Sequence, residues 1–251
     1  MPEQYTHTDA FRGAAFTAAD LTGATFRDCD LSGVRITGSQ VAGLRVSGYG
    51  GSVLVDDVDV TDFVAGELDR RHPERLQLRA MGTAEDYRAM WDTVERLWSE
   101  TVARAERLPE PMRHERVRGE WSFAETLRHL AFATDGWVGR MLTDGAFVYS
   151  PLGLPPSDVS AEDAASIGLD VGVQPSYTET LALFADRRAS VRRVVEGLTD
   201  NGLEEVRTAA LAAPAWGVES HPVAECLRTL MDEYCEHRRF AERDLAVLEG
   251  R

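Results

Sequence analysis

The sequence contains no lysine, so arginine supplies all 27 of its cationic side chains, against 42 aspartates and glutamates. The formal net charge at pH 7 is −15. Nucleic acids and anionic membranes bind basic surfaces, because cationic side chains there displace counterions. We therefore expect no nucleic-acid partner and no membrane partner for this chain.

Long apolar runs and paired cysteines are also lacking. No run approaches the roughly 18 apolar residues of a membrane-spanning helix, and residues 1–10 have neither the basic nor the apolar stretch of an export signal. The cysteines Cys29, Cys226 and Cys235 are an odd number without the spacing of a zinc ribbon. We expect a cytoplasmic protein with reduced thiols.

An apolar side chain recurs at every fifth position near the N-terminus. The positions are Phe11, Phe16, Leu21, Phe26, Leu31, Ile36, Val41 and Val46, and small residues such as Ala14 and Ala19 stand two places before the next centre. A period of five fits neither an α-helix nor a flat strand. The pattern resembles the pentapeptide-repeat family over about residues 9–50. The resemblance implies a right-handed quadrilateral β-solenoid of about two coils.

Some long, acidic and dimeric pentapeptide-repeat proteins mimic DNA, but two coils are too short for that role. The segment GYGGSVLVDDVDVTDFV is expected to end the repeats with one or two short strands. The expected organisation is a solenoid with capping strands over 1–64, a linker over 65–83 and a helical domain over 84–251.

From residue 84 the apolar period becomes that of α-helices. Helices are expected over 84–108, 122–142, 176–198 and 222–249, and capping-box spacings at Ser122 with Glu125 and at Ser176 with Glu179 mark two of the starts. The connection 144–176 is rich in proline and glycine and is expected to form a lid or a pocket wall. The sequence thus predicts a mainly α protein with a four-helix bundle.

Two polar residues of the last helix, Glu233 and His237, are spaced four apart and lie about 40° from each other on the flank of its apolar stripe. Such a pair beside arginines is also typical of a solvated ion-pair face. On the second helix, His129 falls almost opposite the apolar stripe, so it is either solvated or lines a groove. Glu125 is expected to be a helix cap rather than a ligand.

The other chemically capable side chains have structural interpretations. We expect the tryptophans Trp91, Trp98, Trp121 and Trp137 in the bundle core, His114 and Glu120 exposed, Cys226 and Cys235 buried, and Arg238, Arg239 and Arg243 as surface charges.

The motifs WSFAETLRHL (121–130) and EHRRFAERDL (236–245), in this order, resemble the DinB/YfiT-like superfamily over about residues 84–249. Its four-helix bundles commonly hold a divalent metal with three histidines, one from the second helix and two, four residues apart, from the fourth. Carried over to this sequence, His129 matches the first ligand and His237 the last. Glu233 stands where the family usually has histidine. The resemblance thus implies a metal site of His129, Glu233 and His237.

The glutamate has two opposite interpretations. Two histidines and one carboxylate form a three-ligand set that leaves positions open for a thiolate or water on zinc, nickel or iron. Alternatively, the site has lost its metal.

Several members of this superfamily are thiol-dependent enzymes, including mycothiol-linked isomerases and transferases. The resemblance therefore implies a metal-dependent transferase that joins a low-molecular-weight thiol to a small electrophile, with the 144–176 loop around the substrate. Mycothiol is the thiol we expect, because the lack of lysine and the scarcity of asparagine and isoleucine resemble the bias of GC-rich, actinobacterial genomes.

Two alternatives stay open beside this one. A metal-dependent hydrolase would use the same ligands, and a non-catalytic binding or scaffolding protein would need no metal. The resemblance also implies a homodimer.

Overall fold

The computed structural model of the chain describes residues 4–27, 29–48, 50–143, 145–157, 159–211 and 217–251. The chain divides into two compact units, Met1–Gly48 and Tyr49–Arg251. Each unit is described by itself.

The first unit is a series of turns. The carbonyls of Phe11, Leu21, Leu31 and Val41 each accept a hydrogen bond of 2.9–3.1 Å from the backbone N–H three residues later. The third residue of each turn is a glycine with φ between +72° and +78° (Gly13, Gly23, Gly33 and Gly43), which only glycine adopts freely. Residues 4–27 and 29–48 contain no strand, and their apolar repeat centres are 43–69% exposed. The solenoid stays a prediction.

The second unit begins with a small hairpin of β1 (Leu54–Val55) and β2 (Val58–Asp59), which confirms the expected short strands. Two helices follow, α1 (Thr61–Arg71) and α2 (Glu74–Ala80). The segment 65–83, expected to be a linker, is therefore largely helical, and its Leu78 and Met81 belong to the hydrophobic core of the bundle.

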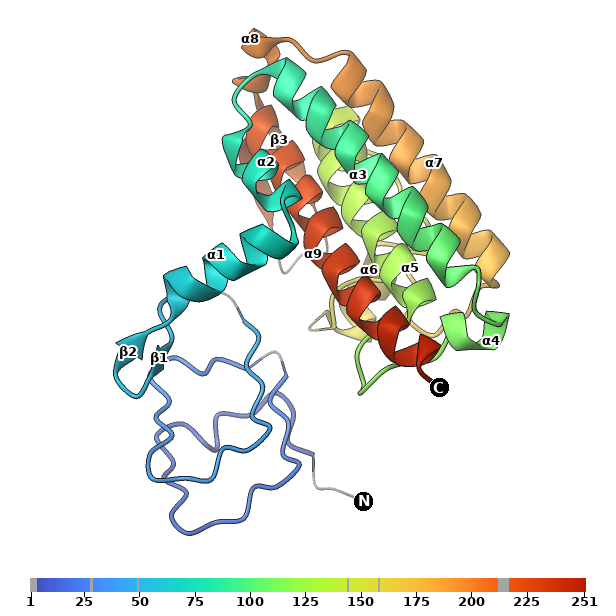
Figure 1. Ribbon diagram of the computed structural model, residues 1–251. Coiled ribbons are helices and arrows are strands. Elements are labelled where there is room, and N and C mark those ends of the chain that lie inside the picture. The colour runs from blue at the N-terminus through green and yellow to red at the C-terminus, as the bar shows by residue number, and fades with distance from the viewer. Residues whose placement is uncertain (1–3, 28, 49, 144, 158, 212–216) are drawn as a thin grey trace. The chain divides into compact units, whose positions relative to one another are not determined.

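Four long helical segments form the bundle (Figure 1). They are α3 (Ala84–Ala105), α5 (Phe123–Thr134) with its π-helical continuation η1 (Asp135–Thr143), α7 (Tyr177–Glu196) and α9 (Val223–Glu249). Thr83, Ser122 and Ser176 each close a capping box at a helix start, which satisfies backbone N–H groups that have no partner inside the helix. The prediction of a mainly helical protein is confirmed.

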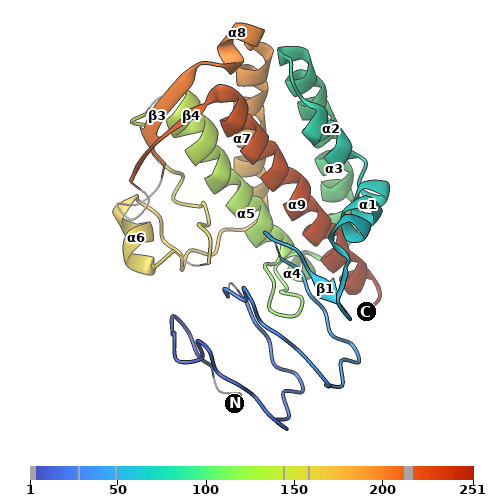
Figure 2. The same cartoon turned by 90° about the vertical axis from the view of Figure 1, so that its left-hand side faces the viewer.

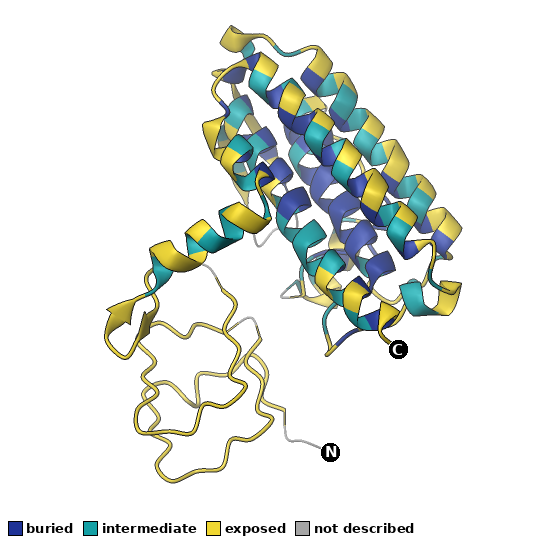
Figure 3. Cartoon of the chain, in the orientation of Figure 1, coloured by how far each residue is buried: buried dark blue, intermediate teal, exposed yellow. Residues whose placement is uncertain are grey.

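The core lies where the buried sides of these helices face one another (Figure 3). Trp91 and Trp98 are fully buried there, and the indole N–H of Trp98 donates to the carbonyl of Tyr234 at 3.0 Å. The most enclosed helix is α5, in which every residue from Phe123 to Thr134 except Glu125 is buried. A helix buried on all sides can hold polar side chains away from bulk water.

Short elements connect the long helices: α4 (Glu110–Arg113), α6 (Ala161–Ser166) and α8 (Asp200–Leu203). The stretch before α9 forms an antiparallel hairpin of β3 (Val206–Ala210) and β4 (Val218–Pro222), with Arg207 opposite His221 (Figure 2). Among the described residues, no helix is long and apolar enough to cross a membrane.

Candidate metal centre

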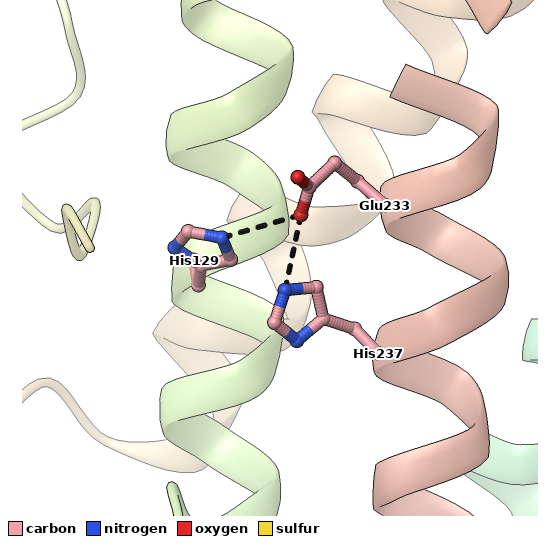
Figure 4. A group of neighbouring side chains, drawn as sticks. All are labelled: His129, Glu233 and His237. Atoms are coloured by element: carbon pink, nitrogen blue, oxygen red, sulfur yellow. Dashed lines mark ion pairs between the residues drawn. The ribbon is translucent and has the colours of Figure 1, made fainter. Parts of the chain in front are cut away.

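Three side chains from two helices converge in the bundle (Figure 4). Oε2 of Glu233 on α9 lies 3.0 Å from Nε2 of His237, one turn further along the same helix. The same oxygen lies 3.6 Å from Nε2 of His129 on α5. The structure therefore brings together the three residues that the resemblance implies as ligands, with one potential ligand atom from each within 4.8 Å of the others.

His129 is buried, with 5% of its surface exposed, although it lies opposite the predicted apolar stripe of its helix. The segment that contains Leu154, which follows η1 in the chain, covers the side of α5 on which His129 lies. The N–H of Leu154 donates to the carbonyl of Arg128 at 3.2 Å, and the carbonyl of Leu154 lies 3.1 Å from Nδ1 of His129. A carbonyl can only accept, so Nδ1 carries the proton and the lone pair of Nε2 faces Glu233. The sequence left open whether His129 is solvated or lines a groove on this side of its helix. The structure excludes the solvated position, because the side chain is buried.

The protonation states at this site favour a cation. Burial lowers the pKa of His129, which keeps its imidazole neutral at neutral pH. Burial acts to raise the pKa of Glu233, but the His129 and His237 imidazoles outweigh it and hold that pKa far below its usual value. With the His129 imidazole neutral and its proton on Nδ1, the Nε2 lone pair faces the Glu233 carboxylate with no proton between them. A cation placed there would keep the carboxylate ionised in place of the imidazole proton that lowers its pKa.

The spacing of the donor atoms is compatible with a metal site. Ligands at about 2.0–2.2 Å from a tetrahedral zinc ion lie about 3.3–3.6 Å from one another. The separation of 3.6 Å between Glu233 and His129 falls in that range, the 3.0 Å between Glu233 and His237 is slightly shorter, and all three donor atoms lie within 4.8 Å of one another. Two imidazole nitrogens and one carboxylate oxygen suit zinc, nickel or iron. The residues present therefore fit a divalent transition metal.

Aromatic rings enclose the two imidazoles. The ring of Trp121 is centred 4.5 Å from that of His129 and stacks at 5.8 Å on that of His237. Phe132 lies 6.2 Å from His129, and Phe240 lies 6.2 Å from His237. Trp121 is thus part of the site's wall, which corrects its assignment to the core. An apolar wall strengthens the electrostatic interactions inside it.

Most of the other assignments from the sequence are confirmed. Glu125 is the capping partner of Ser122, whose N–H donates to it at 2.8 Å, and it takes no part in the metal group. His114 is exposed. Cys226 and Cys235 are buried, and burial raises the pKa of their thiols to about 11 and about 12.

The surface-charge assignment of Arg238 is wrong. Its side chain is only 15% exposed, and its Nε donates to the hydroxyl of Thr101 at 2.9 Å and to the carbonyl of Leu97 at 3.2 Å. Arg238 therefore ties α9 to α3.

Arg128 is a functional candidate that the sequence did not reveal. Its buried guanidinium donates to the carbonyl of Leu152 at 2.8 Å and to that of Gly153 at 3.4 Å. These bonds hold the segment whose next carbonyl, that of Leu154, fixes His129. The motif LRHL places Arg128 beside the histidine, but its partners lie 24 and 25 residues further along the chain.

Arg128→Met is expected to weaken metal binding about tenfold, because hydrogen bonds that orient a ligand typically contribute 10–100-fold to metal affinity. Competition with a chromogenic chelator measures the affinity, and a melting curve checks the fold. Arg128→Lys, which can still donate to Leu152, should recover part of the loss. Arg96→Met, which removes an exposed ion pair on α3, should change nothing. Equal affinities for Arg128→Met and the wild type would remove Arg128 from the site.

Comparison with known protein families agrees with the structure. The profile of the DinB superfamily matches residues 93–241, more than half of the chain. Pentapeptide repeats match residues 11–43 in eight copies. No curated protein and no solved structure matches the chain significantly. The chain therefore belongs to the DinB superfamily and carries N-terminal pentapeptide repeats.

Proposed function

We propose that this protein is a metal-dependent enzyme that transfers a low-molecular-weight thiol of the mycothiol type to a small electrophile. The observation that carries the proposal is the convergence of His129, Glu233 and His237 inside a DinB-superfamily bundle. These three side chains would hold the metal. When bound, a divalent metal lowers the pKa of a coordinated thiol or water, so that a nucleophile forms at neutral pH.

The surrounding residues orient the donor atoms and limit the access of water to the site. The Leu154 carbonyl holds the His129 ring in one tautomer. Trp121 covers both imidazoles and limits the access of water from its side. The Glu233 carboxylate supplies the only negative charge among the three donors, which offsets half of the charge of a divalent ion. A site with one net positive charge would attract a thiolate.

The cysteines of the helical unit are poor nucleophiles. Cys226 is fully buried, and burial raises the pKa of its thiol to about 11. Cys235 is only 6% exposed. Neither cysteine of the helical unit is suited to supply the thiol, so we assign it to a co-substrate. The lysine-free composition, with its resemblance to actinobacterial proteins, supports mycothiol.

For the N-terminal unit we propose the architecture of a two-coil solenoid. The eight matched repeats support it, as does the recurrence of a glycine turn at every second repeat, which is suited to a corner of the coil.

The first test is the metal content of protein purified without a histidine tag or chelator, measured by plasma mass spectrometry. The wild type is expected to carry about one divalent ion per chain and His237→Ala almost none. His114→Ala is the matched control, because it removes an exposed histidine and should leave the metal in place. A wild type that is metal-free and takes up no added zinc, nickel or iron would overturn the proposal in favour of a non-catalytic role.

The second test is the reaction itself, with mycothiol, cysteine or glutathione and the electrophile 1-chloro-2,4-dinitrobenzene. In a transfer, the sulfur–carbon bond forms, chloride leaves with its electron pair and the thiol proton passes to the solvent. Mass spectrometry should detect the thioether with the wild type at a rate that falls to background in His237→Ala. A dinitrophenol product formed without any thiol would instead indicate hydrolysis.

A further inference from the structure

A cavity of about 260 Å³ lies beside the junction of α5 and η1. Phe132, Ala133, Gly136 and Trp137 of these helices line it, together with Tyr149 from the following segment and Glu219 from β4. Figure 2 shows the β3–β4 hairpin close to this end of α5. The lining is mainly apolar, as is usual for sites of small molecules.

One polar group in this wall has no partner. The hydroxyl of Tyr149 is buried and forms no hydrogen bond with any described residue. The ring is fixed from two sides, because it stacks on Phe132 at 5.1 Å and the Arg140 guanidinium lies 4.6 Å from its centroid. Leaving a buried hydroxyl unpaired lowers stability. A ligand in the cavity that accepts a hydrogen bond from this hydroxyl would remove that cost.

The helix next to this hydroxyl leaves room for a ligand. A Cβ atom at Gly136 would lie 3.1 Å from the Tyr149 hydroxyl oxygen, so any larger side chain would crowd it. Gly136 belongs to the nine-residue π-helix η1. π-Helical turns are rare and occur frequently at functional sites. The glycine, the open cavity and the unpaired hydroxyl therefore occur together at an unusual turn.

The charges around the cavity select the kind of ligand. Burial raises the pKa of Tyr149, so the hydroxyl stays protonated and can donate. The carboxylate of Glu219 lines the wall, but it pairs with His221 at 2.8 Å. Beside Tyr149, the Arg140 guanidinium acts to lower the pKa of the hydroxyl and the carboxyl of Asp135 acts to raise it. Cationic and anionic groups thus offset one another around the cavity, which favours a neutral ligand over a charged one.

Volume limits the size of the ligand. An engineered apolar cavity of about 150 Å³ binds benzene, so about 260 Å³ has room for a ring with one small substituent. We infer that this cavity binds a neutral, largely apolar molecule of that size, and that the Tyr149 hydroxyl donates a hydrogen bond to its single acceptor atom.

One aromatic side chain connects the cavity with the candidate metal centre. Phe132 lines the cavity, and its ring is centred 6.2 Å from the ring of His129. If the chain is a thiol transferase, this cavity holds the electrophile. That assignment rests on the proposed function, whereas binding to the cavity does not.

Calorimetric titration with acetophenone and ethylbenzene tests the inference, because the two probes have nearly the same shape and only the first has a carbonyl acceptor. The wild type should bind both, and acetophenone more tightly. Tyr149→Phe should weaken acetophenone binding roughly tenfold and leave ethylbenzene unchanged. Its melting temperature should equal or exceed that of the wild type, because an unpaired buried hydroxyl has been removed.

The matched control is Tyr177→Phe. Tyr177 is also buried with an unpaired hydroxyl among the described residues, but it does not line the cavity. This variant should bind both probes as the wild type does. His237→Ala, which the proposed function predicts to be metal-free, should still bind acetophenone, so the two proposals fail independently.

Three results would overturn the inference. The first is a wild type that binds neither probe. The cavity would then hold water and not an apolar ligand. The second is that Tyr149→Phe weakens the binding of acetophenone and ethylbenzene equally. The hydroxyl would then form no hydrogen bond with the ligand. The third is tighter binding of benzoate than of acetophenone, because the cavity would then select anions.

Discussion

Glu233→Ala is expected to lower the affinity for zinc, nickel or iron by at least about a hundredfold. The variant loses one of three donor atoms and the only negative charge of the set, so its effect should exceed the 10–100-fold contributed by a ligand's hydrogen-bond partner. The measurement is competition against a fluorescent chelator at pH 7, with the metal content after dialysis as a second readout.

Two further substitutions at Glu233 separate charge from ligation. Glu233→Gln keeps the shape but offers a weak neutral donor, so we expect it to behave like the alanine variant. Glu233→His installs the residue usual in the superfamily and is expected to bind zinc within about tenfold of the wild type, because imidazole is a good zinc ligand. Unchanged affinity in Glu233→Ala would show that the carboxylate is not a ligand.

Glu236→Ala is the control for the Glu233 series. Glu236 lies on α9, as Glu233 does, but its carboxylate pairs with Arg75 and Arg239 and not with the two imidazoles. Loss of metal in this variant as well would indicate that the helix, and not the ligand set, had been damaged.

The features that could be predicted from the sequence depend on neighbours along the chain. The capping boxes at Ser122 and Ser176 are formed by residues three apart, so the helix starts were predicted to within a residue. Glu233 and His237 meet because they are one turn apart on a continuous helix. The five-residue repeat was likewise visible as a local period, and the family comparison finds it over residues 11–43.

The surroundings of His129 could not be predicted in this way. A helical wheel assumes one buried side, but α5 is covered on nearly every side. The covering segment places Leu154 against His129, which lies 25 residues earlier in the chain. A contact over that distance cannot be predicted from the periodicity of neighbouring residues. Trp121 precedes the helix and so has no wheel position at all. The β3–β4 hairpin was missed because VRTAA and VESHP lack the alternation of a half-buried strand.

Arg187→Met is expected to destabilise the helical unit by about 3–5 kcal/mol, the usual cost of removing one partner of a buried ion pair. Its guanidinium on α7 pairs with Asp135, whose side chain is fully buried at the start of η1. The same carboxylate accepts a hydrogen bond of 2.8 Å from the N–H of Ser150. Without Arg187 this charge would stay buried and uncompensated. Urea denaturation at pH 7 measures the free energy of unfolding.

The loss should shrink on acidification. Burial raises the pKa of Asp135 above its ordinary value of 3.8 even though Arg187 acts to lower it, so removing Arg187 raises it further. Between the ordinary value and the raised folded pKa, the folded state holds a proton that the unfolded state has released. Stability is therefore highest below the ordinary pKa and falls as the pH rises through the folded one. The difference between the variant and the wild type should thus be smaller at pH 4 than at pH 7.

The double variant Asp135→Asn with Arg187→Met tests this cause directly. An amide in place of the carboxylate still accepts from Ser150 but carries no charge, so the double variant is expected to be more stable at pH 7 than Arg187→Met alone. It should also lose the extra dependence on pH. A single variant whose deficit stays constant from pH 4 to pH 7 would show that Arg187 contributes through packing against its neighbours rather than through the buried charge. Because Ser150 belongs to the segment that continues to Leu154, the same variants would also report how firmly the cover over His129 is anchored.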